Sequence, residues 1–278
     1  MEQRTWLITG VSSGFGRQMT EQLLEKGDRV VGTVRDSAPV GDLMARFGET
    51  LTIKHLDVTN FAAIRPLVDD AFTTLGKIDV VVSNAGYGLI GAAEELTDEQ
   101  MLHQINANLI GSMQLVRAAL PHLRNQGGGR IIQLSTMGGQ AVFPGGSAYH
   151  ASKWGIEGFI DSVAQEVGVF NIGCTIVEPG GARTNFRYQS SRLAPKLDAY
   201  AASPASMARR IIEERTSVPI GDPAKMVDIM IASVDQNPAP RRLALGSDAY
   251  NVMHKQLCER IALLEAQKDL ALSTDFAA

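Results

Sequence analysis

The chain has 278 residues, enough for one large α/β domain with a substantial core, or for two small ones. Its hydrophobic content of 45% and charged content of 20% are ordinary for a globular protein. The net charge of −4 and the pI near 5.8 argue against nucleic acid or an anionic membrane as the main partner, because both attract basic surfaces.

Neither a targeting segment nor a metal cluster is expected. The start of the chain passes from MEQRT into WLITG, an apolar run too short for a signal peptide, and no run approaches the length of a membrane span. Cys174 and Cys258 are expected to be reduced and to serve packing, and a structural zinc site is not expected. The cytoplasm is the expected compartment.

Seven short β-rich runs alternate with longer helical stretches. Most of the runs are apolar throughout, as in strands buried on both faces of a parallel sheet. This rhythm predicts a doubly wound α/β fold with a mostly parallel seven-stranded sheet and right-handed crossovers. The predicted strands are residues 5–9, 29–34, 51–56, 78–83, 129–135, 172–178 and 241–246.

Four stretches between the strands carry apolar residues at helical spacing: 15–27, 61–76, 98–123 and 148–167. TDEQ at 97–100 marks a helix start, since Thr97 can cap the helix and acidic residues occupy its first turn.

Two regions break the alternation. Residues 184–222 are too long for an ordinary connection and predict a substrate lid or binding segment. Residues from about 248 to 278 predict a helix followed by a polar tail that frays. No linker separates these regions from the rest, so residues 1–278 are expected to form a single domain.

A glycine-rich turn joins the first strand to the first helix. Gly10, Gly14 and Gly16 let the backbone turn tightly and approach a pyrophosphate, while the helix N-terminus offers free N–H groups. Their spacing is a variant of the GxGxxG dinucleotide fingerprint. A dinucleotide site is therefore favoured over a purely structural turn.

The run GGSAYHASKWG places a tyrosine and a lysine four residues apart. Tyr149 and Lys153 share one helix face, and a nearby ammonium favours the phenolate form of tyrosine. The pair is predicted to exchange protons near neutral pH; the alternative is a solvated helix with an unrelated Tyr and Lys. His150 points elsewhere on the helix and is not expected to act in catalysis.

Five motifs in this order resemble those of the short-chain dehydrogenase/reductase family in its compact single-domain form. They are TGVSSGFG (9–16), SNAG (83–86), NANLIG with Asn108, YHASK (149–153) and EPGGART (178–184). Ser83 replaces the family's first asparagine in SNAG. The resemblance covers residues 9–184, implies a Rossmann-like sheet, and identifies an NAD(P)-dependent oxidoreductase acting on CH–OH or carbonyl groups.

The same resemblance implies the catalytic residues. Counting 13 places back from Tyr149 lands on Thr136, which takes the position of the family's catalytic serine, and Ser135 is the second candidate. Tyr149 acts as general acid in reduction and as base in oxidation, with its pKa lowered by Lys153. Asn108 holds a water molecule that links Lys153 to solvent.

The preferred cofactor is NADP(H), with NAD(H) as the alternative. Arg35 falls where NADP-preferring members carry a basic residue that suits the 2′-phosphate, but Asp36 lies at the spacing of an NAD-selecting acid. Asp57 is expected either to bind the adenine or to cap the next helix. The expected cofactor contacts are Gly10, Ser12, Ser13, Gly14, Phe15, Gly16, Arg35, Asp57, Val58, Asn84, Ala85, Gly86, Tyr149, Lys153, Pro179, Gly180 and Thr184.

The leading hypothesis is an NADPH-dependent reductase of a ketone or aldehyde, or the reverse alcohol oxidation, and the length of residues 184–222 fits a bulky, hydrophobic small-molecule substrate. The alternatives are an NAD-dependent alcohol or steroid-type dehydrogenase and a non-catalytic protein that senses the cofactor. Met137, Phe143, Phe186 and Tyr188 are candidates for an apolar pocket. By family resemblance, a homodimer or homotetramer is expected through helices near 97–124 and 147–168.

Overall fold

A seven-stranded parallel sheet forms the centre of the molecule, in a computed structural model that describes residues 3–276. Its strand order is β3-β2-β1-β4-β6-β7-β9. The order reverses beside β1, so the crevice between the ends of β1 and β4 is the natural ligand site of such a sheet. The strands are β1 (Thr5–Thr9), β2 (Arg29–Val34), β3 (Leu51–His55), β4 (Val80–Ser83), β6 (Gly129–Leu134), β7 (Ile172–Pro179) and β9 (Arg242–Leu245).

All seven predicted strands and the Rossmann-like fold class are confirmed. Side chains alternate between the two faces of the sheet: Trp6 and Ile8 pack into one apolar cluster, whereas Leu7 packs into another on the opposite face. Both faces are therefore buried, which explains why the strand sequences are apolar throughout.

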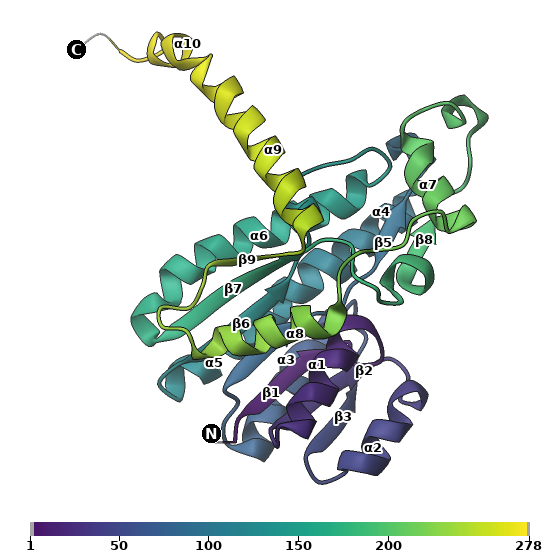
Figure 1. The fold of residues 1–278 in the computed structure, drawn as a ribbon. Coiled ribbons are helices and arrows are strands. Elements are labelled where there is room, and N and C mark those ends of the chain that lie inside the picture. Colours follow the sequence, from purple (N-terminus) through teal and green to yellow (C-terminus); the bar gives the residue numbers. More distant parts are fainter. Residues whose placement is uncertain (1–2, 277–278) are drawn as a thin grey trace.

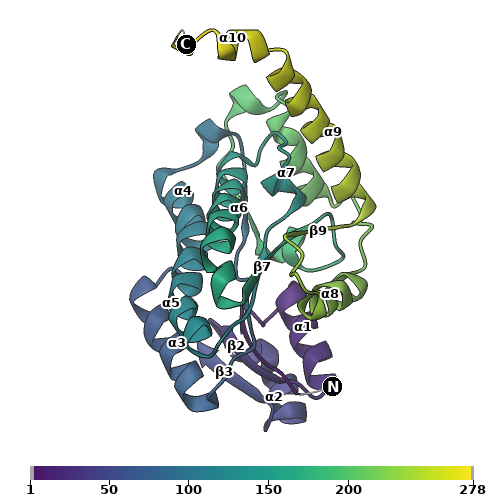
Figure 2. The same ribbon diagram turned by 90° about the vertical axis from the view of Figure 1, so that its left-hand side faces the viewer.

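Helices cover both faces of this sheet (Figures 1 and 2). One layer packs with Trp6 and contains α1 (Gly14–Glu25), α2 (Gly41–Phe47) and α8 (Pro223–Ala232). The other packs with Leu7 and contains α3 (Phe61–Leu75), α5 (Gly111–Asn125) and α6 (Ser147–Val167). The short helix α2 was not predicted, because its seven residues are too few to give a helical periodicity.

The predicted helix at 98–123 is three pieces in one line. Thr97 caps α4 (Asp98–Ile105) and exchanges hydrogen bonds with Gln100, as TDEQ predicts. A π-helical turn, η3 (Asn106–Ile110), then leads into α5. Such π-bulges often occur at functional sites, and this one carries Asn108.

The long segment after β7, which we call the insert (residues 184–222), contains a π-helical turn, a strand and a helix. They are η6 (Phe186–Ser190), β8 (Ser191–Leu193) and α7 (Ala205–Glu214). Strand β8 pairs in parallel with β5 (Gly88–Ile90), which follows β4 in the chain. The insert thus lies against the carboxyl end of the sheet, although neither β5 nor β8 was predicted.

The chain ends in α9 (Ser247–Glu265) and α10 (Lys268–Leu272), and α9 projects from the body of the molecule (Figure 1). The end of the predicted tail, residues 277–278, lies outside the described residues. Among residues 3–276 no helix is long and apolar enough to cross a membrane. The remaining single turns are η1 (Ala38–Val40), η2 (Ala93–Glu95), η4 (Met137–Gly139), η5 (Gly168–Phe170), η7 (Asp198–Tyr200) and η8 (Ser233–Asp235).

The two cysteines differ in their environment. Both are free, but Cys174 is buried in β7 whereas Cys258 is exposed on α9. Burial raises the pKa of the Cys174 thiol to about 11, so this group packs rather than reacts. The expectation that Cys258 also serves packing is wrong, because α9 turns this side chain to solvent.

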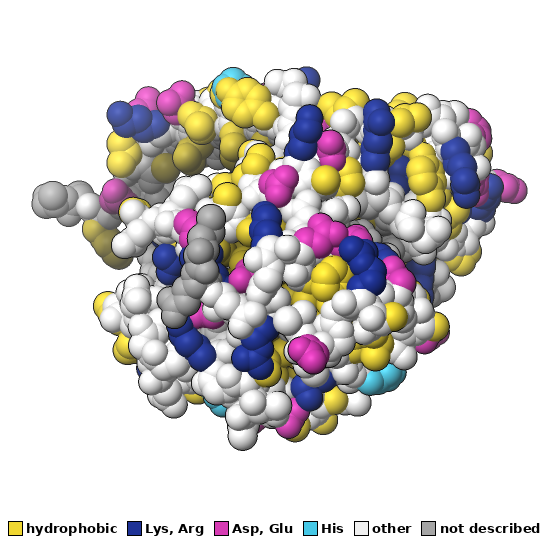
Figure 3. Space-filling model, turned by 60° about the horizontal axis from the view of Figure 1, so that its bottom comes forward, with side chains coloured by type: hydrophobic (Ala, Val, Ile, Leu, Met, Phe, Trp, Pro, Cys, Tyr) yellow, Lys and Arg dark blue, Asp and Glu magenta, His cyan; other side chains and the backbone are white. Residues whose placement is uncertain are grey.

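On the face of the molecule shown in Figure 3, basic and acidic side chains are interspersed.

Candidate active site

A cavity of about 700 Å³ opens at the carboxyl ends of the parallel strands. It is bordered by the glycine turn after β1, the ends of β2 and β4, the YHASK motif of α6 and the insert. Parallel α/β sheets bind their ligands at this edge. All the predicted catalytic and cofactor residues line the cavity except Gly16 and Asn108, which lie just behind its wall.

The glycine turn has the backbone geometry that a pyrophosphate requires. Gly10 and Gly14 have φ angles of 75° and 57°, a region that favours glycine. A Cβ atom on Gly16 would lie 2.3 Å from the carbonyl oxygen of Gly10, so the helix can start this close to the strand only with glycine. Gly14 faces open space, and no side chain caps the N-terminus of α1 at Ser13. The free N–H groups there fit a dinucleotide phosphate.

Asn84 supports this turn from β4. Its Nδ2 donates to the carbonyl oxygens of Thr9 and Gly10 at 2.8 and 3.1 Å. In return, the Thr9 hydroxyl accepts the backbone N–H groups of Asn84 and Ala85 at 3.0 and 3.1 Å. The Asn84 side chain therefore fixes the two strand ends that border the cavity.

The end of β2 separates the two candidates for cofactor selection. Arg35 is exposed and lines the cavity. Asp36 does not line it, and its Oδ1 accepts the N–H of Ala38 at 3.0 Å in a local turn. The basic side chain therefore faces the cavity and the acidic one is directed to its own backbone.

Asp57 lines the cavity without capping the next helix, because Asn60 holds the N-cap position of α3. It accepts the N–H and the hydroxyl of Thr59 at 2.9 and 2.7 Å. Burial raises the pKa of Asp57, but the Thr59 hydrogen bonds and the nearby Arg35 outweigh it, so the pKa is lowered. The carboxylate is thus held ionised and in place.

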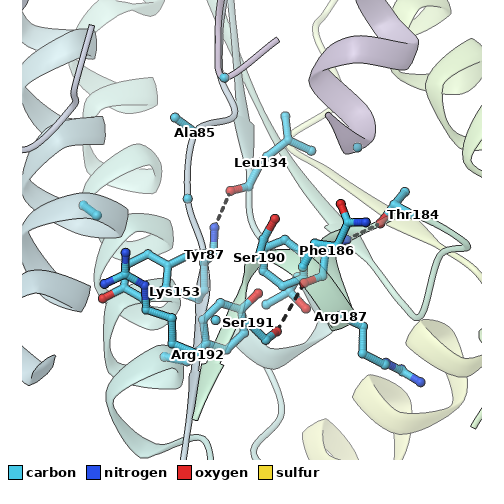
Figure 4. A pocket seen from close by; sticks show the side chains of 18 of the residues that line it. Ala85, Tyr87, Leu134, Lys153, Thr184, Phe186, Arg187, Ser190, Ser191 and Arg192 are labelled. Atoms are coloured by element: carbon cyan, nitrogen blue, oxygen red, sulfur yellow. Dashed lines mark hydrogen bonds between the residues drawn. The ribbon is translucent and has the colours of Figure 1, made fainter. Parts of the chain in front are cut away.

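Tyr149 and Lys153 lie one turn apart on α6 and both border the cavity. The Lys153 ammonium donates to the carbonyl oxygen of Leu134 at 2.9 Å, a bond marked in Figure 4. Its Nζ lies 6.0 Å from the centre of the Tyr149 ring. Only 8% of Tyr149 and 6% of Lys153 is exposed, so β6 and α6 hold both groups away from bulk water.

The pKa shifts of this pair differ from the sequence-based expectation. Burial raises the pKa of Tyr149 to about 12, although the Thr136 hydroxyl partly counteracts it. Burial lowers the pKa of Lys153 to about 8, against the pull of Glu157. The net shift of the phenol pKa is therefore upward, opposite to the lowering expected from Lys153, because burial outweighs the other influences.

The two candidate hydroxyls after β6 point to different partners. Thr136 lies close enough to the Tyr149 phenol to lower its pKa against the effect of burial, and its hydroxyl donates to the carbonyl oxygen of Pro179 at 3.4 Å. Ser135 donates instead to the buried carboxylate of Glu157. The structure thus places Thr136, and not Ser135, beside the phenol, while its catalytic role stays a prediction.

Asn108 is buried in the π-helical turn and bonds to the loop after β4. Its Oδ1 accepts the N–H of Tyr87 at 3.0 Å, and its Nδ2 donates to the Tyr87 carbonyl at 2.8 Å. A longer bond of 3.3 Å reaches the Ser152 hydroxyl. Asn108 therefore ties α4–α5 to the cavity wall and to α6, and the proposed water relay stays a prediction.

A buried ionic cluster behind the catalytic turn escaped the sequence analysis. Glu157 accepts hydrogen bonds from Ser135, Gln140 and Arg242. Arg242 also pairs with Glu178, whose pKa is raised to about 7 by burial and by the charge of Glu157. The available signal was helical spacing, since Glu157 follows Lys153 by four residues on the same face of α6.

Part of the cavity wall is apolar, whereas residues 187 and 189–192 of the insert add polar side chains. Met137, Phe143 and Phe186 line it as predicted, and the Phe186 ring centre is 6.3 Å from that of Tyr149. Tyr188 was wrongly assigned, because its hydroxyl donates to the Ser217 carbonyl at 2.7 Å within the insert. Helix α7 adds further apolar side chains that the sequence analysis missed: Met207, Ala208, Ile211 and Ile212.

The comparisons with known proteins agree with this geometry. The family model described as short chain dehydrogenase matches residues 4–193. The oxidoreductase BOA17 of Botryotinia fuckeliana is 34% identical over 272 residues, which are 98% of this chain and 99% of the relative. The chain belongs to the short-chain dehydrogenase/reductase family. The structure of a short-chain dehydrogenase from Streptomyces avermitilis is 36% identical, with a TM-score of 0.91 and 99% coverage of both chains.

This short-chain dehydrogenase/reductase is therefore an NAD(P)-dependent oxidoreductase, as the sequence motifs predicted. The glycine turn and the strand ends described above fit a nicotinamide dinucleotide. ElxO, which was solved with NADP bound, shares the fold at 20% identity and a TM-score of 0.75, covering 90% of this chain and 100% of that one.

Proposed function

We propose that this short-chain dehydrogenase/reductase uses NADP(H) to reduce an apolar ketone or aldehyde, or to oxidise the matching alcohol. The observation that carries the proposal is the pairing of the Thr136 hydroxyl with the buried Tyr149 phenol at the floor of an apolar cavity. A sensor that only binds a cofactor has no use for such a pair.

The preference for NADP(H) is supported by the side chains at the end of β2. A guanidinium at Arg35 suits a 2′-phosphate, whereas the carboxylate of Asp36 is occupied by the Ala38 N–H. NADP is also the ligand of ElxO, which has the same fold. The NAD-dependent alternative requires Asp36 to leave its turn.

The chemical roles follow from the protonation states. Bound nicotinamide supplies or accepts the hydride. Tyr149, whose pKa burial raises to about 12, is protonated at neutral pH and gives this proton to the carbonyl oxygen as negative charge develops there. Thr136 holds that oxygen as negative charge develops on it. Lys153 holds the cofactor ribose, and Asn108 organises a relay that returns a proton to the site.

The apolar character of the substrate is supported by the cavity wall. Phe143 and Phe186 line the cavity, with the Phe186 ring beside Tyr149, and α7 adds Met207, Ile211 and Ile212. A 3-ketodihydrosphingosine reductase of Bacteroides thetaiotaomicron is 36% identical over 186 residues, or 67% of this chain and 66% of the relative. We assign the insert the role of a lid over this cavity.

The experiment measures NADPH and NADH affinity by fluorescence, and oxidation of each with a panel of apolar ketones and aldehydes. Wild type is expected to bind NADPH at least about tenfold more tightly than NADH, and Arg35→Ala to lose most of this ratio. Tyr149→Phe is expected to bind NADPH normally and to lower kcat by about 10²–10⁴.

Three outcomes would contradict parts of the proposal. Equal NADPH affinity of Arg35→Ala and wild type refutes the cofactor assignment and favours the NAD-dependent alternative. Full turnover by Tyr149→Phe refutes the catalytic assignment. Binding of NADPH without oxidation by any carbonyl favours the cofactor sensor.

The proposal includes a homodimer or homotetramer formed through α4–α5 and α6, as in other members of the family. Light scattering after size-exclusion chromatography tests it, and a monomer at micromolar concentration would contradict it.

A further inference from the structure

One buried ion pair connects helix α7 of the insert to the body of the molecule. Glu95 lies in η2, after β5, and Arg209 lies in the middle of α7. Their side chains are each 7% exposed, and Arg209 Nη2 is 3.3 Å from Glu95 Oε2. The two residues are 114 positions apart in the sequence, so the pair joins segments that the chain itself does not link.

Backbone groups of two segments complete the pair. Glu95 accepts the N–H of Ala92 at 2.8 Å and that of Leu197 at 3.0 Å. Arg209 donates to the carbonyl oxygens of Ala194 and Pro195 at 2.8 and 3.2 Å. The pair thus fastens both α7 and the stretch after β8 to the turn that follows β5.

The charges of this pair are stable at neutral pH. Burial raises the pKa of Glu95, but the N–H groups of Leu197 and Ala92 and the Arg209 guanidinium outweigh it, so the pKa is lowered. Arginine stays protonated throughout the working range of proteins. Removing either partner leaves the other charge buried without its counter-charge, with only backbone hydrogen bonds to stabilise it, which is unfavourable.

Helix α7 uses a different face to line the substrate cavity. Met207, Ala208, Ile211 and Ile212 border the cavity at helical spacing. Arg209 follows Ala208, about 100° further around the helix, and does not border the cavity. The ion pair therefore fixes how far the apolar face of α7 stands from Tyr149 without touching a ligand in the cavity.

We propose that Glu95 and Arg209 form a positioning clamp that holds α7 as the outer wall of the cavity, and so selects carbonyl substrates with an extended apolar chain. This inference rests on the reductase activity proposed above. An extended chain gains from the wall because each buried methylene contributes to binding, whereas a short carbonyl reaches only Thr136, Tyr149 and the nearest aromatic rings.

The test compares Arg209→Met and Glu95→Gln with wild type on a homologous series of methyl ketones of increasing chain length. In wild type, KM is expected to fall by up to about fourfold for each added methylene that reaches α7. In both variants this dependence is expected to flatten to less than about twofold per methylene, while kcat for the shortest ketone stays within about threefold.

A matched control removes a second ion pair from the same helix. Lys196 pairs with Glu213 of α7 at 3.1 Å, but the two side chains are 64% and 35% exposed. Lys196→Met is expected to leave the chain-length dependence unchanged, because exposed pairs contribute little. Flattening in Lys196→Met equal to that in Arg209→Met would overturn the inference, and so would an unchanged dependence in Arg209→Met and Glu95→Gln.

Two further readouts do not depend on turnover. Trypsin cleavage of the NADPH-bound protein after Arg210 and Arg215 is expected to be at least about tenfold faster in Arg209→Met, with an unchanged NADPH dissociation constant. If Arg209→Met does not fold, Glu95→Gln carries the same tests with a smaller volume change. Wild-type cleavage rates in both variants would overturn the clamp, whereas cleavage at the expected rate without any NADPH oxidation would refute only the reductase.

Discussion

The division of labour between Ser135 and Thr136 has a direct consequence for catalysis. Thr136 lies beside the Tyr149 phenol, whereas the Ser135 hydroxyl donates a hydrogen bond to Glu157. Thr136→Val is expected to lower kcat for reduction by about 10²–10³, because it removes a donor from the developing alkoxide. Ser135→Ala is expected to lower kcat by less than about tenfold. Steady-state kinetics with saturating NADPH measures kcat of both variants. A larger loss of kcat in Ser135→Ala than in Thr136→Val would assign the catalytic hydroxyl to Ser135.

The pKa shifts of Tyr149 and Lys153 could not be predicted from the sequence. Spacing alone placed Tyr149 and Lys153 on one face of α6, and the structure agrees. Their pKa shifts follow from burial under β6 and the insert, which no local pattern encodes. The phenol is therefore protonated at neutral pH in this structure, as the proposed role of Tyr149 as proton donor in reduction requires.

At the scale of elements, two glycines near Glu157 differ in the space that a Cβ atom would have, so their alanine variants can be compared directly. A Cβ atom on Gly139, in η4, would lie 1.8 Å from a carboxylate oxygen of Glu157, whereas one on Gly158, in α6, would have no atom within 4 Å. Gly139→Ala is expected to destabilise the protein by about 1–3 kcal/mol through displacement of a buried hydrogen-bonded carboxylate. Gly158→Ala is expected to stabilise it by about 0.5–1 kcal/mol. Denaturant unfolding measures both, and equal changes would mean that Glu157 moves away without cost.

Helix α6 also carries a buried histidine whose titration affects the whole molecule. His150 is 5% exposed, its Nε2 has no hydrogen-bond partner, and burial lowers its pKa to about 4. As pH falls from about 6.5 to 4, the unfolded chain binds a proton at this residue before the folded protein does. The free energy of unfolding is therefore expected to lose about 3 kcal/mol from His150 across this window.

The contribution of His150 is isolated by difference. Glu178 acts in the opposite direction in part of the same window, because its pKa is raised to about 7. The measurement is therefore the difference in free energy of unfolding between wild type and His150→Gln, obtained from urea titrations at pH 7 and pH 4.5. This difference is expected to be smaller at pH 4.5. His254→Gln, at an exposed position of α9, is the control and is expected to show no such change. An equal difference in free energy of unfolding at the two pH values would show that the pKa of His150 is not lowered by folding.

For the molecule as a whole, local sequence patterns and their order along the chain were enough to predict the fold and the family. Apolar runs predicted all seven strands of the main sheet, and five motifs, among them the glycine turn and YHASK, predicted the family and part of the cavity lining. These features are local: a buried strand needs consecutive apolar residues, a phosphate turn needs glycine, and a helix face needs a spacing of four.

Only the tertiary structure decided which groups meet across the fold. It brought Glu95 to Arg209, Ser135 to Glu157, and β8 beside β5. Such partners are separated by many residues and obey no periodicity, and their energies depend on the burial that packing creates. The sequence by itself therefore determined the fold and the chemical class of the site, whereas packing decided the pKa shifts of Tyr149 and Lys153, the different neighbours of Ser135 and Thr136, and the position of α7 at the cavity.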